Sequence, residues 1–455
     1  MKIRVLSRSD AEWSGRNDGA QNRARFSKNV NPALHPPQHP LDVHRSVTAA
    51  KLNRILARPF LFACTPSHVD GVYCLARSRT DISLLASAAA DGELKLWHLP
   101  THSPRFQLTC TPPAFVRGVT FSHDSRRILF CTDAKLVHSA NVHADYEQQP
   151  ALKSQLHNYQ ANAGPLAAIH AHYAQPQFAT ASSVVQIWHE TRSAPIQTLS
   201  TTIDSLHCVQ WNPVETSILA SAASDRSIVL YDVRAKLPVR SLVLKMRTND
   251  ISWNPIEPFN FVTANDDHNC YTYDMRKLTS KGALTVHKDH TAAVMSVDFS
   301  PTGQEFVTGS YDKTIRIFPY TAGRSREIYH TKRMQRVFAV SFSLDASYLI
   351  SGSDDGDVRV WKSDRSRPLK PLFAAEREKV HMSDKLIERY QGLPEVRRIA
   401  KKRHVPAHVR SMQLTKSIIK KSAQRKERNV RRHTAADKRP KKVTEREKNI
   451  VRELE

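Results

Sequence analysis

Apolar and polar residues alternate with a period of two through much of residues 59–368. The clearest examples read as a strand, a polar or proline-containing turn and a second strand: VTFSHDSRRILF (119–130), VQWNPVETSILA (209–220), ISWNPIEPFNFV (251–262), VDFSPTGQEFVT (297–308) and VSFSLDASYLIS (340–351). A period of two places Val, Ile, Leu and Phe on faces that neighbouring sheets bury. The pattern therefore predicts an all-β body made of short antiparallel strands.

A second motif follows these hairpins, with an Asp and then an aromatic residue six positions later. It occurs as ADGELKLW (90–97), SDRSIVLY (224–231), YDKTIRIF (311–318) and DDGDVRVW (354–361), and more loosely as DDHNCYTY (266–273). TDAKLVHS (132–139) keeps Asp133 but lacks the aromatic residue, and SSVVQIW (182–188) has Ser182 in place of the Asp. The seven closing positions are 97, 139, 188, 231, 273, 318 and 361, with spacings of 42, 49, 43, 42, 45 and 43 residues.

A period of 40 to 45 residues with a turn Asp and a closing aromatic is typical of WD40 blades. Unrelated hairpins of a β-sandwich would not keep so constant a spacing. We therefore predict a seven-bladed propeller over residues 59–368. The carboxylates expected to accept hydrogen bonds at the blade turns are Asp91, Asp225, Asp267, Asp312 and Asp355.

The seventh repeat supplies only three strands after Arg336. The segment PFLFAC (59–64), just ahead of the first repeat, is predicted to pair with the last blade and close the ring. Before it, SVTAAKLNRILA (46–57) predicts a short helix with Ser46 as its N-cap, within an N-terminal extension of residues 1–58.

Residues 369–455 predict a largely helical C-terminal domain. SDKLIERYQ (383–391) is expected to form a helix capped by Ser383, and residues 409–433 a long helix. The apolar stripe of the long helix is thin and interrupted: Val409, Met412, Leu414, Ile418, Ile419 and Val430. Such a helix buries little surface alone, so it should need a partner surface. Partial disorder is expected over residues 433–455.

The net charge of +25 is concentrated at the two ends of the chain. Residues 397–455 contain 21 Lys and Arg against 6 Asp and Glu, and residues 1–60 contain 11 against 4. The remaining middle has 36 against 33. Cationic ends on a nearly neutral body are typical of proteins that bind polyanions, either nucleic acid or an acidic membrane surface.

RNA is the expected polyanion rather than DNA, because the chain has no DNA groove-reading motif such as a zinc finger or basic zipper. Tyr390 is the only aromatic residue after Phe373, so backbone and shape contacts should dominate over base stacking. The candidate RNA-binding residues are Arg397, Arg398, Lys401, Lys402, Arg403, Lys420, Lys421, Arg425, Arg428, Arg431 and Arg432, with Lys332, Arg333 and Arg336 ahead of the last blade. A solvated tail, or an import signal at KRPKK (438–442), is the alternative.

Several stretches together resemble one WD40 family over nearly the whole chain. They are NPALHPPQHP (31–40), residues 254–278, residues 300–318, YHTKRMQRVFAVSFS (329–343) and VRRIAKKRHVP (396–406). The chain resembles the nucleolar WD40 protein of the U3 small nucleolar ribonucleoprotein, which has a basic C-terminal domain. This resemblance implies a nucleolar, non-enzymatic assembly factor of the small-subunit processome. It would act in 18S precursor RNA processing, with precursor rRNA, U3 RNA and other processome proteins as partners.

A different interpretation arises from YDVR (231–234) and YDMR (273–276). These resemble the aromatic–Asp–x–Arg ending of substrate receptors of cullin-4 ubiquitin ligases, where the Arg contacts the ligase adaptor. Arg234 and Arg276 are therefore candidate adaptor contacts. In the simpler alternative, each Arg pairs locally with the Asp of its own motif.

Enzyme motifs are absent: the chain has no GxxxxGK[ST], HExxH or GxSxG, so no catalysis, cofactor or small-molecule substrate is expected. His170 and His172 lie two residues apart but have no acidic partner nearby, so no metal site is predicted. The six cysteines contain no CxxC pair and are predicted to be buried thiols of a reducing compartment. Neither a secretory signal nor a membrane span is expected.

Overall fold

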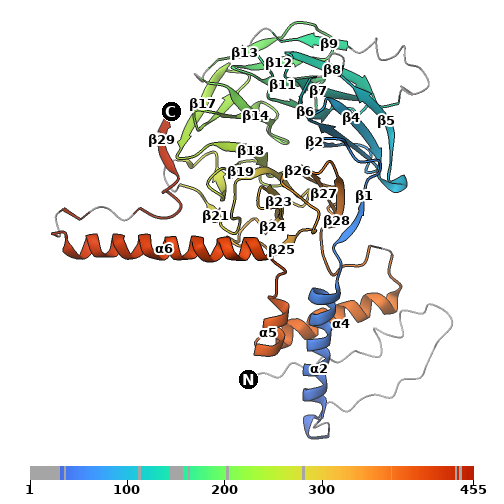
Figure 1. Cartoon of the computed structure of the whole chain (residues 1–455), viewed down its shortest axis with the longest axis vertical. Helices are drawn as coiled ribbons and strands as arrows, with labels where there is room; N and C mark the ends of the chain where they lie inside the picture. The colour runs from blue at the N-terminus through green and yellow to red at the C-terminus, as the bar shows by residue number, and fades with distance from the viewer. Residues whose placement is uncertain are drawn as a thin grey trace. The chain divides into compact units, whose positions relative to one another are not determined.

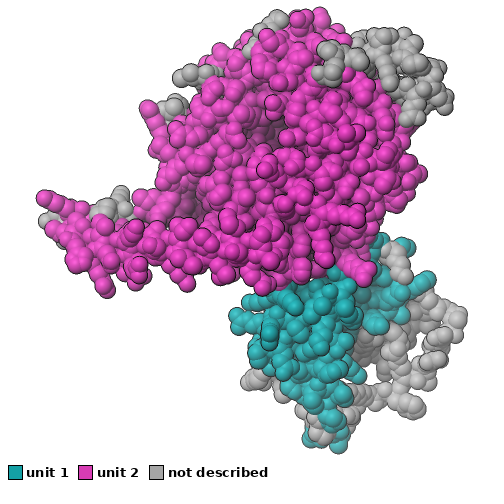
Figure 2. Space-filling view, viewed as in Figure 1, with its two compact units in different colours: residues 1–57, 368–402 teal, residues 58–367, 403–455 magenta. Residues whose placement is uncertain are grey.

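The computed structural model describes residues 31–34, 37–110, 114–143, 157–161, 164–200, 204–278, 282–369, 371–435, 438–439 and 443–454. These residues form two compact units, shown in different colours in Figure 2. One unit comprises residues 58–367 and 403–455, and the other comprises residues 1–57 and 368–402. Most of the N-terminal extension predicted from the sequence, residues 1–30, lies outside the described residues.

The larger unit is a ring of seven antiparallel sheets (Figure 1). Blade 1 contains β2 (Val72–Arg77), β3 (Leu84–Ala89), β4 (Glu93–His98) and β5 (Ser103–Thr109). Blade 2 contains β6 (Val116–Phe121), β7 (Arg127–Thr132), β8 (Leu136–Asn141) and β9 (His157–Gln160). Blade 3 contains β10 (Ala168–Ala171), β11 (Gln177–Ala181), β12 (Val185–His189) and β13 (Gln197–Leu199).

The remaining blades repeat this order. Blade 4 contains β14 (Leu206–Trp211), β15 (Ile218–Ala223), β16 (Ser227–Asp232) and β17 (Leu237–Leu244). Blade 5 contains β18 (Thr248–Trp253), β19 (Asn260–Asn265), β20 (Cys270–Asp274) and β21 (Thr285–His287). Blade 6 contains β22 (Val294–Phe299), β23 (Glu305–Ser310), β24 (Ile315–Pro319) and β25 (Glu327–Tyr329). The first strand of each blade contacts the first strand of the next, and that of the last contacts β2, so the predicted seven-bladed propeller is confirmed.

Blade 7 is built from both ends of the propeller sequence. β26 (Val337–Phe342), β27 (Tyr348–Ser353) and β28 (Val358–Lys362) are followed in the sheet by β1 (Phe60–Ala63). β1 pairs antiparallel with β28, with Phe60 opposite Trp361. This is the place that the sequence predicted for residues 59–64, and the pairing covers an edge that would otherwise be open.

Blade 4 has a fifth strand, which the sequence analysis did not predict. β29 (Ile450–Leu454) pairs antiparallel with β17, with Leu242 opposite Glu453. The expected disorder over residues 433–455 is therefore wrong for this part, because the open edge of β17 supplies the backbone partners that the segment lacks alone. Residues 440–442 of the candidate import signal lie outside the described residues.

The closing aromatic residues lie in the cores between blades. Trp97, Trp188, Tyr231, Tyr273, Phe318 and Trp361 are all almost fully buried. The indole Nε1 of Trp97 donates a 2.7 Å hydrogen bond to Ser87 Oγ, and that of Trp361 donates a 2.9 Å bond to Ser351 Oγ. The indoles therefore bury large apolar surface without leaving their N–H groups unpaired.

The turn carboxylates accept hydrogen bonds as the repeat predicted. Asp91 Oδ1 accepts from the Glu93 N–H at 2.9 Å, and the same bond across two residues recurs at Asp225, Asp267 and Asp312. Asp355 instead pairs with Arg359 and Ser353. In blade 3 the Ser182 hydroxyl replaces the missing carboxylate and accepts from the Val184 N–H at 3.4 Å.

Side chains on the inner strands also bond neighbouring blades together. Asp250 Oδ2 of β18 accepts from the Val297 N–H of β22 at 2.9 Å. Asp298 Oδ2 of β22 accepts from the Phe342 N–H of β26 at 2.8 Å. These polar contacts fix the register between blades, which apolar packing alone specifies less sharply.

The smaller unit is helical and uses both chain ends. It contains α2 (Gln38–Lys51), a π turn over Leu52–Leu56, α4 (Ala374–Tyr390) and α5 (Pro394–Ala400), with a short 3-10 turn at Pro32–Leu34. Its core is Ala50, Leu386, Tyr390 and Val396, edged by partly buried residues such as Val47 and Met382. Neither terminal region alone has enough apolar residues for this core.

Two helix starts were predicted wrongly. α2 begins after Pro37, with Pro40 in its first turn, where proline is tolerated. Ser46 is buried inside the helix and donates to the Val43 carbonyl at 2.7 Å. α4 begins after Phe373, nine residues before Ser383, whose hydroxyl donates to the Lys379 carbonyl at 2.9 Å. Ser side chains bond backbone carbonyls within helices as well as capping them.

The structure divides the C-terminal region differently from the prediction. The predicted boundaries at 58 and 368 lie close to the observed ones, but residues 369–455 do not form one domain. Residues 368–402 belong with α2, whereas α6 (Ala407–His433) and β29 belong with the ring. Among the described residues, no helix is both long and apolar enough to cross a membrane.

Candidate protein and RNA interface

The first half of α6 is held against the ring at blade 6 (Figure 1). Just before the helix, Arg403 Nη1 contacts Asp289 Oδ2 at 3.1 Å. Gln413 Nε2 donates to the Asp289 carbonyl at 3.2 Å, and Lys416 Nζ donates to the His290 carbonyl at 3.1 Å. Val409 is fully buried on the same side of the helix. Of the thin apolar stripe, Val409 alone is buried, so the helix is joined to the propeller mainly by polar contacts and not through the stripe.

The second half of α6 is held by the return segment, which we define as residues 443–454. Glu445 forms ion pairs with Lys288 of the ring and with Lys420 of α6, the latter at 2.8 Å. These two lysines lower the pKa of Glu445 to about 2. One carboxylate thus joins three parts of the chain, and β29 then fixes the end of the segment to β17.

One face of α6 is cationic and exposed. Lys421, Arg425, Arg428 and Arg432 are separated by three or four residues, so they lie on one side of the helix. All four are exposed, and the stripe containing Val409, Gln413, Lys416 and Lys420 is turned toward the ring and the return segment. We call these four residues the cationic face. Figure 1 shows the second half of α6 extending beyond the ring.

The other cations predicted for RNA are placed differently. Lys420 pairs with Glu445, Arg403 pairs with Asp289, and Arg431 is only partly exposed. These three are therefore engaged in, or turned toward, the protein. In the helical unit, Arg397 and Arg398 of α5, with Lys401 and Lys402 after it, are exposed.

The loop between β25 and β26 carries three exposed cations, Lys332, Arg333 and Arg336. The His330 ring at its start stacks on the His404 ring, with centroids 4.9 Å apart, and a 2.8 Å hydrogen bond links the two rings. The loop therefore contacts the segment that leads into α6 at His404.

Arg234 and Arg276 occupy corresponding turns after the third strands of blades 4 and 5. Each guanidinium pairs with the Asp two residues earlier, Arg234 Nε with Asp232 at 3.4 Å and Arg276 Nε with Asp274 at 3.2 Å. Burial alone would raise the pKa of Asp274, but hydrogen bonds from Arg276 outweigh it and hold the pKa below its ordinary value. Both Arg side chains are more than half exposed, so the local pairing still leaves them accessible.

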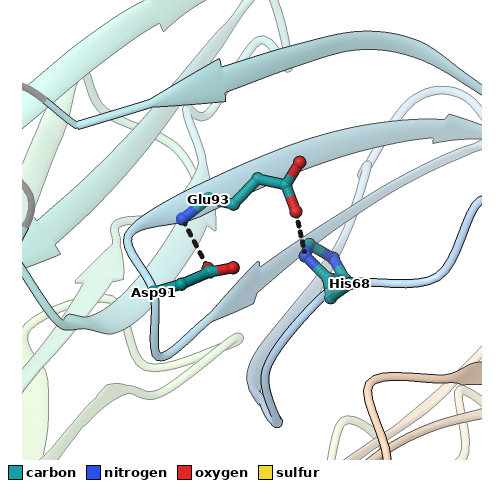
Figure 3. A group of neighbouring side chains, drawn as sticks. All are labelled: His68, Asp91 and Glu93. Atoms are coloured by element: carbon teal, nitrogen blue, oxygen red, sulfur yellow. Dashed lines mark hydrogen bonds and ion pairs between the residues drawn. The ribbon is translucent and has the colours of Figure 1, made fainter.

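Figure 3 shows the one group of His, Cys, Asp and Glu side chains among the described residues whose spacing would suit a metal ion. His68 Nδ1 lies 3.1 Å from Glu93 Oε2, and Asp91 bonds the Glu93 backbone. His68 Nε2 is already bonded to Ser87 Oγ at 2.7 Å, and Lys95 Nζ lies 3.2 Å from Glu93. Burial lowers the pKa of His68 to about 3. An ammonium group beside the carboxylate marks this cluster as a structural hydrogen-bond network.

His170 and His172 are likewise engaged in the fold. His170 Nδ1 accepts from the backbone N–H of Trp211 at 3.3 Å, and His172 Nε2 lies 3.1 Å from the Thr216 carbonyl. Burial lowers the pKa of His170 to about 3. All six cysteines are free thiols.

A cavity of about 1250 Å³ lies between blades 5 and 6, α6 and the return segment. Its cationic lining residues are Lys288, Arg324, Lys416, Lys420 and Arg446, and its acidic ones are Asp289, Glu445 and Glu447. The lining of the cavity thus has a small excess of positive charge, five cations against three acids.

Sequence reasoning missed the residues that dock α6. Gln413, Lys416, Lys288 and Glu445 act through contacts between distant segments, and none belongs to a motif. The apolar residues Ile450, Val451 and Leu454 were the only signal for β29, and they are too few to stand out beside so many charges.

A seven-bladed ring with turn carboxylates and buried closing aromatics belongs to the WD40 propeller class, and WD40 repeat matches cover residues 61–98, 282–318 and 326–362. The C-terminal part matches the Sof1-like domain over residues 363–450. Both kinds of domain are in general non-catalytic scaffolds.

Three full-length relatives carry the name DDB1- and CUL4-associated factor 13. The protein of Danio rerio is 39% identical over 461 residues, covering 100% of both chains. That of Mus musculus is 41% identical over 453 residues, covering 99% of both. That of Dictyostelium discoideum is 38% identical over 444 residues, covering 97% of this chain and 98% of the relative. The chain belongs to this family of WD40 proteins with a Sof1-like domain, and the family expected from the sequence is confirmed.

Proposed function

We propose that this protein is a non-enzymatic ribosome assembly factor associated with the U3 ribonucleoprotein in the small-subunit processome. It acts in the nucleolus, in the processing of 18S precursor RNA. The propeller docks protein partners, and α6 binds precursor rRNA or U3 RNA. The observation that carries the RNA part is the cationic face, because it lies within the Sof1-like domain and all four of its residues are exposed.

The chemistry of the cationic face supports phosphate as its partner. Four like charges on one side of a helix repel one another, so the isolated face is electrostatically unfavourable. Binding to an RNA backbone removes this repulsion and releases condensed counterions. Aromatic residues are absent from α6, so the face offers no stacking platform for bases.

A salt titration tests the RNA role on the full-length protein. The change is Arg425→Glu with Arg428→Glu, and the probe is a fluorescently labelled transcript of the 18S precursor. Because each phosphate contact contributes about 0.7 to 0.9 to the slope of log affinity against log salt, the variant should lose about 1.5 from that slope. Its affinity at low salt should fall at least tenfold.

The matched control is Arg126→Glu with Arg192→Glu, which makes the same change in net charge on exposed positions of blades 2 and 3. It should keep nearly the wild-type slope. If both double variants lose the same affinity, α6 acts only through net charge, and this interface is rejected. In cells, crosslinking should recover U3 or precursor RNA on residues 420–432.

A second candidate function rests on Arg234 and Arg276. The relatives' names associate them with DDB1 and CUL4, and the two exposed guanidiniums lie in equivalent turns of adjacent blades. In this reading the protein delivers substrates to a cullin-4 ubiquitin ligase through the DDB1 adaptor. The same propeller could serve both functions, since the two sites use different residues.

Co-purification with DDB1 tests this second function. Arg234→Ala with Arg276→Ala should abolish recovery of the adaptor while leaving RNA binding unchanged. Arg226→Ala with Lys277→Ala, exposed cations of the same two blades, is the control and should retain the adaptor. Undiminished recovery with the first pair would exclude these arginines as the adaptor contact.

A further inference from the structure

Four aromatic side chains form a continuous arc across blades 6, 7, 1 and 2. Tyr311 packs edge-on against Phe338, with ring centroids 5.8 Å apart. Phe338 stacks on Tyr73 at 4.2 Å, and Tyr73 packs against Phe115 at 4.8 Å. Tyr73 and Phe338 also line the central channel, so the arc lies at a mouth of the channel.

An arginine lies over each end of the arc. The Arg336 guanidinium lies 5.4 Å from the Tyr311 ring centroid, and the Arg117 guanidinium lies 4.3 Å from the Phe115 centroid. Both arginines are exposed, and no described carboxylate forms an ion pair with either. A guanidinium resting on an aromatic ring keeps its N–H groups free for bidentate contact with a carboxylate.

The arc remains accessible. Tyr311 is 37% exposed, Tyr73 and Phe115 are partly exposed, and only Phe338 is buried. Exposed clusters of Tyr, Phe and Arg have the composition of protein-binding hot spots. The fold does not need aromatic residues at the positions of Tyr73 and Phe338, because other blades place His207, Asn249 and Met295 at the second position of their first strands.

We propose that the arc binds a short extended peptide of a protein partner, in which an apolar side chain packs on the rings and acidic residues on both sides reach Arg117 and Arg336. An extended strand rises about 3.3 Å per residue, so four or five residues would follow the three centroid steps of the arc. This site deepens the protein-docking part of the proposed function and is independent of the cationic face.

Charge around the arc favours a peptide over RNA. Burial, with the nearby carboxylates of Asp354 and Asp70, raises the pKa of Tyr73, so two acids lie close to the middle of the arc. These acids would repel a continuous phosphate backbone. A peptide with acidic residues only at its two ends places an apolar side chain opposite them and avoids this repulsion.

Peptide display against the full-length protein tests the proposal, with a library of random ten-residue peptides as the probe. Selection on wild type should enrich sequences with an apolar residue between Asp or Glu residues. Arg117→Glu should weaken an enriched peptide at least tenfold, and Tyr311→Ala should weaken it by a similar factor. Arg126→Glu makes the same charge change in blade 2 away from the arc and should stay within twofold of wild type.

The proposal is overturned if no peptide family distinguishes wild type from Arg117→Glu, or if the enriched peptides lack acidic residues. A ten-nucleotide single-stranded RNA that binds wild type and is lost in Arg117→Glu would assign the arc to nucleic acid and would also overturn it. Thermal unfolding checks that each variant is folded. Peptide binding should survive Arg425→Glu with Arg428→Glu, so failure of the RNA role and failure of this site are separable.

Discussion

Residues at the same position of the WD40 repeat differ in burial and in the number of contacts they make. Asp91 is exposed and accepts one hydrogen bond, from the backbone N–H of Glu93. Asp312 is buried, accepts from Thr314 and lies 2.9 Å from His290 Nδ1. The buried Arg316 guanidinium lies 3.7 Å from the same carboxylate. Burial alone would raise the pKa of Asp312. The contacts with His290 and Arg316 outweigh burial, so the pKa of Asp312 lies below its ordinary value.

Substitution of these two carboxylates should distinguish the exposed turn hydrogen bond of Asp91 from the buried ion pair of Asp312. Asp312→Asn leaves the buried Arg316 without its closest counter-charge and should cost about 3 kcal/mol. Asp91→Asn weakens one exposed hydrogen bond and should cost about 1 kcal/mol or less. Chemical denaturation of both variants measures the difference. Equal losses at the two positions would show that the repeat position, and not burial, sets the cost.

Buried neutral histidines should make the propeller sensitive to acid. His287 is buried, and burial lowers its pKa to about 4 despite a 2.8 Å bond to the Ala322 carbonyl. Its pKa in the unfolded chain is about 6.5. The unfolded chain therefore binds more protons between these two values, so the stability that neutral His287 provides is present above pH 6.5 and is lost as pH falls toward 4.

The comparison that tests this is His287→Asn at pH 7.5 and pH 5. The variant should be less stable than wild type at pH 7.5. The difference in free energy of unfolding between the two proteins should be about 2 kcal/mol smaller at pH 5, because one pKa unit corresponds to about 1.4 kcal/mol. His433→Asn, at the exposed end of α6, is the control and should show no such narrowing. A gap that stays constant with pH would contradict the neutral state of His287.

At the scale of elements, α6 depends on other segments more than on its own sequence. Five of its apolar side chains, Met412, Leu414, Ile418, Ile419 and Val430, remain more than half exposed. Its anchors are polar contacts to blade 6 and the Glu445 ion pairs from the return segment. The orientation of the cationic face is therefore set by a segment that follows it in the sequence.

Loss of the Glu445 carboxylate should loosen the second half of α6. Exposed ion pairs contribute up to about 1 kcal/mol each, so amide hydrogen exchange over residues 417–433 should rise about two- to fivefold in Glu445→Ala. Glu447→Ala removes only an exposed 3.4 Å hydrogen bond from the Thr444 N–H and no ion pair with Lys288 or Lys420, so it should change exchange less than Glu445→Ala does. Equal protection in both variants would show that the Glu445 ion pairs do not hold this part of the helix.

At the scale of the whole molecule, N-terminal segments pack with C-terminal segments in two places. β1 from the N-terminal side completes blade 7, and α2 completes the helical unit with α4 and α5. Between these two N-terminal elements lies the boundary between the units, at residues 57 and 58. Each unit is thus assembled from segments more than 290 residues apart.

Two truncations should have different effects on the propeller. Removal of residues 1–57 deletes α2 and keeps β1, so the ring should unfold near the wild-type temperature. Removal of residues 1–64 also deletes β1, which exposes the β28 edge and uncovers Trp361 beside Phe60. The second truncation should lower the melting temperature by several degrees and increase aggregation. Calorimetry compares the two, and identical melting would show that β1 does not fasten the ring.

Local patterns predicted the features that depend on neighbouring residues. Period two, the repeat spacing and the turn Asp define blades, because each depends on residues within a few positions of one another. The long helix over 409–433 was found for the same reason, within two residues of its observed start. The starts of α2 and α4 were missed, since Ser46 and Ser383 satisfy their hydroxyls inside a helix as readily as at its cap.

The sequence by itself determined the seven repeats, the closing strand, the helical and cationic ends and the family. Only the tertiary structure decided which cations are exposed on α6, that the return segment becomes a strand on β17, and that aromatic residues of four blades meet between Arg117 and Arg336. The physical reason is sequence separation. Burial, ion pairing and ring stacking depend on which distant segments meet, and closure of the ring brings those segments together.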